Sequence, residues 1–329
     1  MDNSDGNVDK AVVIDDDRSE ESVEVEPEKE KISGDEETEK IYVLHPDSEE
    51  LDFNHSRLSK LENLEPLTNI KKLCFTWNLI KKIENLDTLT TLVELELRDN
   101  QITVIENLDA LVNLKILDLS FNRLKKIENL DNLKKLQELF LSSNKIAKIE
   151  NLSHLENLVL LELGDNKIRV IENLQGLQRL TNLFLGKNKI IKLENLAHLV
   201  NLTLLSVQSN RLTKIENLEE LIELDQLYLS ENGLTCIENL KAQTKLTTLD
   251  LADNQIKKIE GISQMELLEE LWMNNNKIED WAALEALAEN KKLQTVYLEH
   301  NPISKDPNYR RKIKLLLPWL TQLDATLCR

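Results

Sequence analysis

The chain of 329 residues repeats itself every 22 residues, and no other feature of the sequence limits its fold so strongly. An asparagine recurs at that interval from Asn78 to Asn276, and once more at Asn301 after an interval of 25. Around each asparagine the chain reads L-x-x-L-x-L-x-x-N-x-I-x-x-I-E-N-L-x-x-L, and an earlier copy with Ser56 at the asparagine position brings the count to 12. A single copy cannot bury its own leucines, so the copies must stack and share one core.

The spacing of the apolar residues predicts the path of each copy. In L-x-L the two leucines alternate with another residue, which predicts a short strand whose leucines point inward while the middle residue points outward. The chain then returns through I-x-x-I-E-N-L-x-x-L, for which we expect a loop and a short helical or 3-10 piece. The pattern therefore predicts an α/β solenoid with a parallel sheet on its concave side and short helical turns on its convex side.

Two polar positions recur in the copies, and we expect both to be structural. The amide of the repeat asparagine, as in Asn144, can satisfy backbone groups of its own turn and of the neighbouring copy. The glutamates that recur from Glu62 to Glu260 would repel one another. We expect lysines two residues before their own glutamate to neutralise them: Lys82, Lys126, Lys148, Lys192, Lys214 and Lys258.

Composition excludes several classes of protein. With only 7 glycines the chain has no glycine-rich phosphate motif, and its net charge of −18 argues against nucleic acid as a partner. The chain contains no long apolar run, so we predict neither a membrane span nor a secretory leader. The cysteines, Cys74, Cys236 and Cys328, lie far apart, which fits a reducing compartment and no metal motif. No histidine, serine or cysteine stands in a catalytic motif, so we expect no enzyme and no cofactor.

Changes in pattern divide the chain into three parts. Residues 1–40 hold 16 acids, five bases and no aromatic residue, which predicts an acidic, disordered tail. Residues 41–301 are predicted to form the solenoid, with 41–50 as its N-terminal lid. After Asn301 the period breaks at a proline and an amphipathic run follows, which predicts a turn and a cap helix within residues 302–329.

The outward-facing residues of the predicted strands form columns, with neighbours about 4.8 Å apart. Four residues before each repeat asparagine, the column reads Asp52, Cys74, Glu96, Asp118, Phe140, Glu162, Phe184, Ser206, Tyr228, Asp250, Trp272 and Tyr297. Six residues before it, a second column contains Glu50, Glu94, Glu138 and Glu270. The two columns together hold nine acids and a single base, Lys72.

Aromatic residues in the first column recur every 44 residues from Phe140 to Trp272, and acidic or polar residues alternate with them. A solvated sheet face would explain one aromatic residue, but no second layer is predicted to cover a whole row. We therefore predict a binding surface for a folded protein or peptide with basic groups. Its candidate residues are Asp118, Phe140, Glu162, Phe184, Tyr228, Asp250, Glu270, Trp272 and Tyr297.

Four features of the sequence occur together: the repeat signature I-E-N-L, the twelve copies, the acidic N-terminal segment and the terminal run N-P-x-x-x-D-P-x-Y-R-R-K. Together they resemble the leucine-rich-repeat regulatory subunits of type 1 protein phosphatase, and the likeness covers roughly residues 41–329. The resemblance implies that the phosphatase-contacting residues lie on the concave face. The matching positions are the candidate residues above, apart from Tyr228, which comes from the column alone.

The resemblance also implies a role and partners. The chain would be a non-catalytic subunit that holds the phosphatase catalytic subunit and controls its activity, maturation or targeting. A further phosphatase inhibitor protein would be a second partner, and the chain would be a monomer before the complex forms. The family implies occurrence in the nucleus and the cytoplasm and a link to the cell cycle.

Two other functions fit parts of the sequence. The low isoelectric point and acidic N-terminus are typical of acidic leucine-rich proteins that bind histones or act as chaperones. A similar C-terminal cap occurs in ribonucleoprotein scaffolds. Binding of core histones that requires the N-terminal tail would favour the first, and a salt-insensitive pull-down that lacks RNA would argue against the second.

Overall fold

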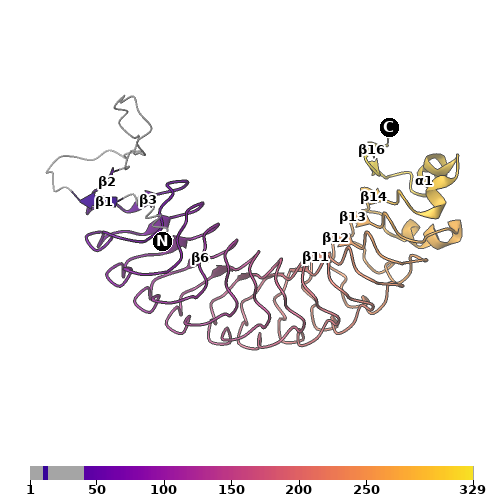
Figure 1. Cartoon of the computed structure of the whole chain (residues 1–329). Helices are drawn as coiled ribbons and strands as arrows, with labels where there is room; N and C mark the ends of the chain where they lie inside the picture. Colours follow the sequence, from indigo (N-terminus) through magenta and orange to yellow (C-terminus); the bar gives the residue numbers. More distant parts are fainter. Residues whose placement is uncertain (1–9, 14–40, 329) are drawn as a thin grey trace, which may run out of the picture. The chain divides into compact units, whose positions relative to one another are not determined.

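In a computed structural model of the chain, residues 10–13 and 41–328 are described. They belong to two compact units, residues 1–136 and residues 137–329. Figure 1 colours the chain by residue number. Both units are built from the same rung, a three-residue strand followed by a return path, so that consecutive strands lie side by side and run in parallel.

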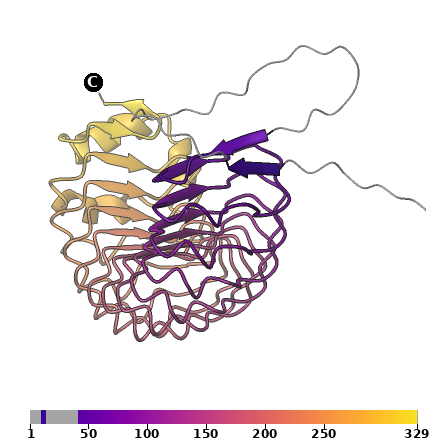
Figure 2. The same cartoon turned by 90° about the vertical axis from the view of Figure 1, so that its left-hand side faces the viewer.

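The N-terminal unit contains strands of two sheets (Figure 2). Strand β1 (Lys10–Val13) pairs in parallel with β2 (Ile41–Leu44). The expected acidic tail thus contains a strand; residues 1–9 and 14–40 lie outside the described part, so their predicted disorder stays a prediction. The strands of the second sheet that belong to this unit pair in parallel with one another: β3 (Glu50–Asp52), β4 (Lys72–Cys74), β5 (Glu94–Glu96) and β6 (Ile116–Asp118).

The C-terminal unit continues the pattern with a longer sheet, whose last strand, β16 (Thr326–Leu327), runs antiparallel to β15. The remaining neighbours are parallel. These strands are β7 (Glu138–Phe140), β8 (Leu160–Glu162), β9 (Asn182–Phe184), β10 (Leu204–Ser206), β11 (Gln226–Tyr228), β12 (Thr248–Asp250), β13 (Glu270–Trp272), β14 (Thr295–Tyr297) and β15 (Gln322–Leu323).

The leucines of the L-x-L segments form the core of each unit, as predicted. Leu139 and Leu141 of one rung, and Leu161 and Leu163 of the next, are fully buried. The register places Leu139 beside Leu161, so each rung covers the leucines of its neighbour. Burying one leucine in this way contributes about 1.5–3 kcal/mol. The predicted parallel-sheet solenoid is confirmed.

The return path consists mainly of tight turns. In a typical rung the amide of Leu155 donates to the carbonyl of Leu152 at 2.9 Å, and the amide of Leu158 donates to the carbonyl of Leu155 at 3.0 Å. Consecutive turns of this kind take the place of a continuous helix, because the return path of a 22-residue rung is too short for one. The predicted 3-10 helix is present in the longer rung after Asn276, as η1 (Trp281–Glu289).

The repeat asparagines join each rung to the one before it. The side-chain amide of Asn166 donates to the carbonyls of Leu163 and Gly164 in its own rung, both at 3.1 Å, and to the carbonyl of Leu141 in the preceding rung at 2.9 Å. Its carbonyl oxygen accepts from the amide of Ile146 at 2.9 Å. Asn166 itself is buried, and the predicted structural role of this ladder is confirmed.

A second asparagine ladder, which the sequence did not reveal, occupies the I-E-N-L segment. Asn173 has a φ of 60°, in the left-handed region that asparagine adopts more easily than most residues. Its side-chain amide donates to the carbonyl of Ile149 in the preceding rung at 2.7 Å. At Gly261 (φ 67°) glycine takes this position, which keeps the backbone conformation and gives up the side-chain hydrogen bond.

The glutamate flank is only partly neutralised. Two of the six predicted pairs form, Lys82 with Glu84 at 3.4 Å and Lys148 with Glu150 at 3.9 Å. The other four lysines make no ion pair within the part of the chain that the structure describes. Exposed pairs of this kind contribute at most about 1 kcal/mol each. The flank is therefore a solvated surface.

The C-terminal cap contains the predicted turn and helix, and it adds a hairpin. After η2 (Pro302–Lys305) comes helix α1 (Tyr309–Leu316), and the chain then forms β15 and β16 beside β14 (Figure 1). The hairpin was not predicted, because its two strands have only two residues each.

A buried carboxylate fastens the cap to the last rung. Asp324 accepts from the amides of Leu298 and Glu299 at 2.8 and 2.9 Å, and from the hydroxyl of Tyr309 at 3.1 Å. Burial and the neighbouring carboxylate of Asp324 raise the pKa of Tyr309, so the phenol stays protonated and donates. Asp324 thus accepts hydrogen bonds from backbone amides of the preceding rung, as the side-chain oxygen of a repeat asparagine does in an ordinary rung.

The two asparagine ladders should differ in their effect on stability. Replacing Asn166 with alanine leaves several buried backbone groups without partners and should lower the free energy of unfolding by about 3 kcal/mol. Replacing Asn173 with glycine keeps the left-handed backbone and should cost only about 1 kcal/mol. Urea denaturation followed by circular dichroism measures both. Equal losses would contradict the different roles assigned to them.

The cap should loosen when its carboxylate is removed. Asp324→Ala leaves two buried amides and one hydroxyl without an acceptor and should cost about 3 kcal/mol, whereas Tyr309→Phe removes one hydrogen bond and should cost about 1 kcal/mol. Hydrogen exchange at the amides of Leu298 and Glu299 should accelerate strongly in the first variant and little in the second. Unchanged exchange in Asp324→Ala would show that the cap is held in another way.

Candidate protein-binding face

The predicted binding residues lie on one side of the sheet in each unit. We call this side the sheet face; it is formed by the first and third residues of the strands, whose middle residues point into the core. The N-terminal unit holds Asp118, in β6. The C-terminal unit holds the other eight candidates: Phe140, Glu162, Phe184, Tyr228, Asp250, Glu270, Trp272 and Tyr297.

Within the C-terminal unit the strand register brings the predicted column together. Each third residue pairs with the third residue of the next strand, for example Phe140 with Glu162 and Asp250 with Trp272. Neighbouring positions are therefore about 4.8 Å apart, and acidic or polar residues alternate with aromatic ones along the sheet. Glu270 lies at the start of β13, two residues before Trp272 on the same face.

The aromatic residues of the sheet face are held in place by their neighbours. Trp272 and Tyr297 contact edge to face with ring centroids 5.7 Å apart. The hydroxyl of Tyr228 donates to Gln226 at 3.0 Å, and the hydroxyl of Tyr297 accepts from Gln322 in the cap at 2.7 Å. All three are half-buried, and Trp272 and Tyr297 partly cover each other.

Two of the acidic candidates accept hydrogen bonds from backbone amides. Asp250 is only 5% exposed, and it accepts from the hydroxyl of Ser230 and, at 3.0 Å, from the amide of Ala252. Asp118 accepts from the amide of Ser120 at 2.8 Å. Burial raises the pKa of both carboxyls. The longer Glu162 and Glu270 are half-buried and carry the negative charge farther from the strand backbone.

The sheet face of the N-terminal unit is less acidic than its sequence indicates. The ammonium group of Lys72 contacts the carboxylates of Glu94 at 2.8 Å and Glu96 at 3.1 Å, and the hydrogen bond with Glu94 contributes most to raising the pKa of Lys72. Burial would raise the pKa of Glu96, but hydrogen bonds from Lys72 and neighbouring groups lower it. Burial raises the pKa of the Cys74 thiol to about 11. This thiol is therefore protonated and unreactive.

Two exposed aromatic residues of the N-terminal unit lie outside the two predicted columns. Trp77 and Phe121 are 52% and 43% exposed and have φ angles of 58° and 55°, which bulky residues rarely adopt. His55 stacks on Trp77 at 5.2 Å, and the guanidinium of Arg98 lies 4.7 Å from the ring centre of Phe121. Both aromatic residues directly precede a repeat asparagine, so reading that position along the repeats would have found them.

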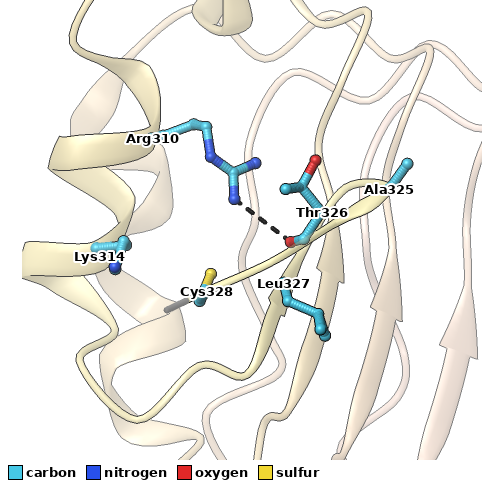
Figure 3. A pocket seen from close by; sticks show the side chains of 6 residues that line it. All are labelled: Arg310, Lys314, Ala325, Thr326, Leu327 and Cys328. Carbon is cyan, nitrogen blue, oxygen red and sulfur yellow. Dashed lines mark hydrogen bonds between the residues drawn. The ribbon is translucent and has the colours of Figure 1, made fainter.

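A pocket of about 480 Å³ lies between α1 and β16 (Figure 3). Arg310 reaches across it and donates to the carbonyls of Leu323 at 3.0 Å and Thr326 at 3.3 Å. The guanidinium is thus occupied in holding the hairpin, and the pocket belongs to the cap. Its lining residues are Arg310, Lys314, Ala325, Thr326, Leu327 and Cys328.

The part of the chain that comprises residues 10–13 and 41–328 contains no cluster of three or more His, Cys, Asp or Glu side chains that could hold a metal ion. None of the helices in it is long and apolar enough to cross a membrane.

Comparison with protein families agrees with the rungs described above. A family model described as leucine-rich repeat matches residues 223–327, and a second, described as leucine rich repeats in two copies, matches residues 90–132 and 112–154. The chain has a leucine-rich-repeat fold. Among solved structures, an internalin from Listeria monocytogenes is similar with a TM-score of 0.70 and 25% identity, over 85% of this chain and 87% of that one. A leucine-rich-repeat protein of Leptospira interrogans gives a TM-score of 0.66 at 24% identity, over 79% of this chain and 73% of that one.

The curated relatives of this leucine-rich-repeat chain are more specific, over a shorter stretch. Protein phosphatase 1 regulatory subunit 7 of Danio rerio is 59% identical over 49 residues, which is 15% of this chain. The protein of the same name from Homo sapiens is 55% identical over 52 residues, or 16% of this chain. The match spans 14% of the length of each of these two relatives.

The buried carboxyl of Asp250 should make stability depend on pH in a defined direction. Its folded-state pKa lies above the ordinary value, so only the folded protein takes up this proton as the pH falls from about 7 toward 4. The wild type should therefore gain stability relative to Asp250→Asn over that range, and the difference should level off below the unfolded-state pKa. Denaturation midpoints of the two proteins at several pH values test this. A relative gain for the wild type with rising pH would contradict the assigned burial.

Proposed function

We propose that the chain is a non-catalytic regulatory subunit that binds the catalytic subunit of type 1 serine/threonine protein phosphatase through its sheet face. The observation that supports this most is the row of alternating aromatic and acidic residues on the rigid sheet of the C-terminal unit. The names of the curated relatives, all regulatory subunits of protein phosphatase 1, supply the identity of the partner.

The sheet face has the physical properties that such a role requires. Its aromatic side chains are already ordered by contacts such as that of Trp272 with Tyr297, so binding costs little further side-chain entropy. Phe184 lies between Glu162 and Ser206 in register, which surrounds an apolar anchor with polar groups. The carboxylates favour a partner surface with basic groups and speed the encounter with it.

We assign different roles to the individual acids of the sheet face. Because Asp250 is buried and serves the turn at Ala252, we assign it a positioning role in keeping the rung beside Tyr228 in register. Glu162 and Glu270 are the acids that we assign to the partner. Trp272 and Phe184 are the apolar anchors.

The remaining parts of the proposal follow the family resemblance. Binding would control the activity, maturation or targeting of the phosphatase, in the nucleus and in the cytoplasm, and would connect the chain with the cell cycle. A phosphatase inhibitor protein would join as a further partner, and the chain would be a monomer before the complex forms.

Calorimetric titration with the purified phosphatase catalytic subunit tests the proposal. Trp272→Ala and Phe184→Ala should each weaken binding by about 2 kcal/mol, or roughly 30-fold in Kd, because each removes an apolar anchor. Two controls should bind like the wild type. Trp77→Ala removes the same side chain from a position outside the sheet face, and Glu172→Ala removes a charge from the glutamate flank.

Three outcomes would contradict parts of the proposal. Equal affinities for all five proteins, with circular dichroism unchanged, would place the interface elsewhere. An equal loss for Trp77→Ala and Trp272→Ala would show that the sheet face is not the specific contact. Binding of core histones without any binding of the phosphatase would favour an acidic histone-binding protein.

A further inference from the structure

The edge of the C-terminal unit next to the repeat asparagines has a charge opposite to that of the sheet face. In four consecutive rungs, the residues from one before to four after the asparagine are 143–148, 165–170, 187–192 and 209–214. They include nine cations and a single acid, Asp165. We call these cations, together with Val170 and Ile191, the basic ridge: Lys145, Lys148, Lys167, Arg169, Lys187, Lys189, Lys192, Arg211 and Lys214.

Backbone hydrogen bonds hold the ridge residues of successive rungs side by side. The amide of Lys167 donates to the carbonyl of Ile146 at 2.8 Å, and the amide of Lys189 donates to that of Ile168 at 2.8 Å. The amide of Arg211 continues the series to Ile190 at 2.9 Å. The cations thus stand on a fixed backbone, about one strand spacing apart from rung to rung.

The positive charge of the ridge is mostly unbalanced. Eight of its nine cations are exposed, and Lys189 is half-buried. Within residues 10–13 and 41–328, Lys148 is the one ridge cation that lies within 4.0 Å of a carboxylate, that of Glu150 at 3.9 Å. The carboxylate of Asp165 accepts instead from the hydroxyl of Ser143 at 2.9 Å. The charges are therefore available to a partner.

The ridge ends sharply in the sequence. In the next two rungs the same positions hold Glu231 and Asp253 against Lys257 and Lys258, which leaves no net charge. Gly233 takes the place of the first cation after the asparagine. The rung geometry does not require this change, because the backbone hydrogen bond continues from the amide of Gly233 to Leu212 at 2.7 Å. In the other direction along the sequence the excess continues for one rung: the same window around Asn122, in the N-terminal unit, holds Arg123, Lys125 and Lys126 and no acid, whereas the window around Asn100 holds Asp99 and no cation. The accumulation of cations is thus a property of some consecutive rungs and not of every repeat.

Two aliphatic side chains stand among the cations. Ile191 is 65% exposed and Val170 is 42% exposed, and they lie in adjacent rungs. Exposed aliphatic groups surrounded by cations offer a protein partner apolar contacts within a polar rim. A nucleic acid would use the cations and leave these side chains in water. The net charge of −18 would also repel a long polyanion.

We propose that the basic ridge binds an acidic segment of a partner protein that carries aliphatic side chains between its carboxylates. The carboxylates would pair with the lysines and arginines, and the aliphatic side chains would pack on Ile191 and Val170. This surface is separate from the sheet face, so one unit offers an acidic and a basic binding site to two different chains.

A labelled peptide of repeated Glu-Asp-Ile-Glu units tests the proposal by fluorescence anisotropy with the full chain. The double variant Arg169→Glu/Lys192→Glu should bind it about tenfold more weakly or worse and should show a smaller dependence on salt. The matched control Lys257→Glu/Lys258→Glu changes the same two repeat positions outside the ridge and should bind like the wild type. Ile191→Ser should also weaken binding of this peptide, but not of a peptide in which serine replaces isoleucine.

Each result decides the proposal. Weaker binding by the ridge variant alone, with circular dichroism unchanged, supports it, and unchanged binding of the phosphatase by that variant separates it from the proposed function. Equal peptide affinities for the ridge variant and the control overturn it. Tighter binding of a single-stranded DNA of similar length than of the peptide overturns the assigned class of partner.

Discussion

The structure depends on the hydrogen bonds that each repeat asparagine makes to two successive rungs. A rung of 22 residues turns sharply twice, and its turn carries backbone carbonyls and amides into the leucine core. Buried backbone groups without partners are costly, and leucine offers none. The side-chain amide of Asn188 donates to three carbonyls and accepts from one backbone amide, and the other repeat asparagines make contacts of the same kind. The sheet register and the position of every outward side chain follow from this contact.

Because the asparagines and leucines fix the rung, the outward residues are released from any role in folding. The same backbone can therefore present Phe184 on the sheet face and Lys187 at the edge, only three residues apart. The positions that specify the fold are thus separate from the outward positions, which are available for other roles. Asp250 and Tyr297 are exceptions, since they form part of the interior bonding of a rung and of the cap.

Periodicity in the sequence predicts what repeats and misses what happens once or depends on conformation. The strands, the inward leucines and the neighbour relations of the sheet face follow from counting, because every rung obeys the same spacing. The burial of Asp250 does not follow, since it depends on Ser230 and on a turn that no residue pattern specifies. The hairpin of the cap does not follow from the periodicity either, because it occurs once and its strands of two residues show no repeating pattern.

The rung between Asn276 and Asn301 is three residues longer than the others, and the surplus is taken up in the 3-10 helix Trp281–Glu289 on the return path. Trp272 still pairs with Tyr297, and Asn301 still donates to the carbonyl of Met273 at 2.8 Å. Insertions in this protein can therefore accumulate on the outer side without moving any residue of the sheet. During evolution the scaffold could lengthen its rungs, or acquire new outer elements, while the sheet face kept the same geometry.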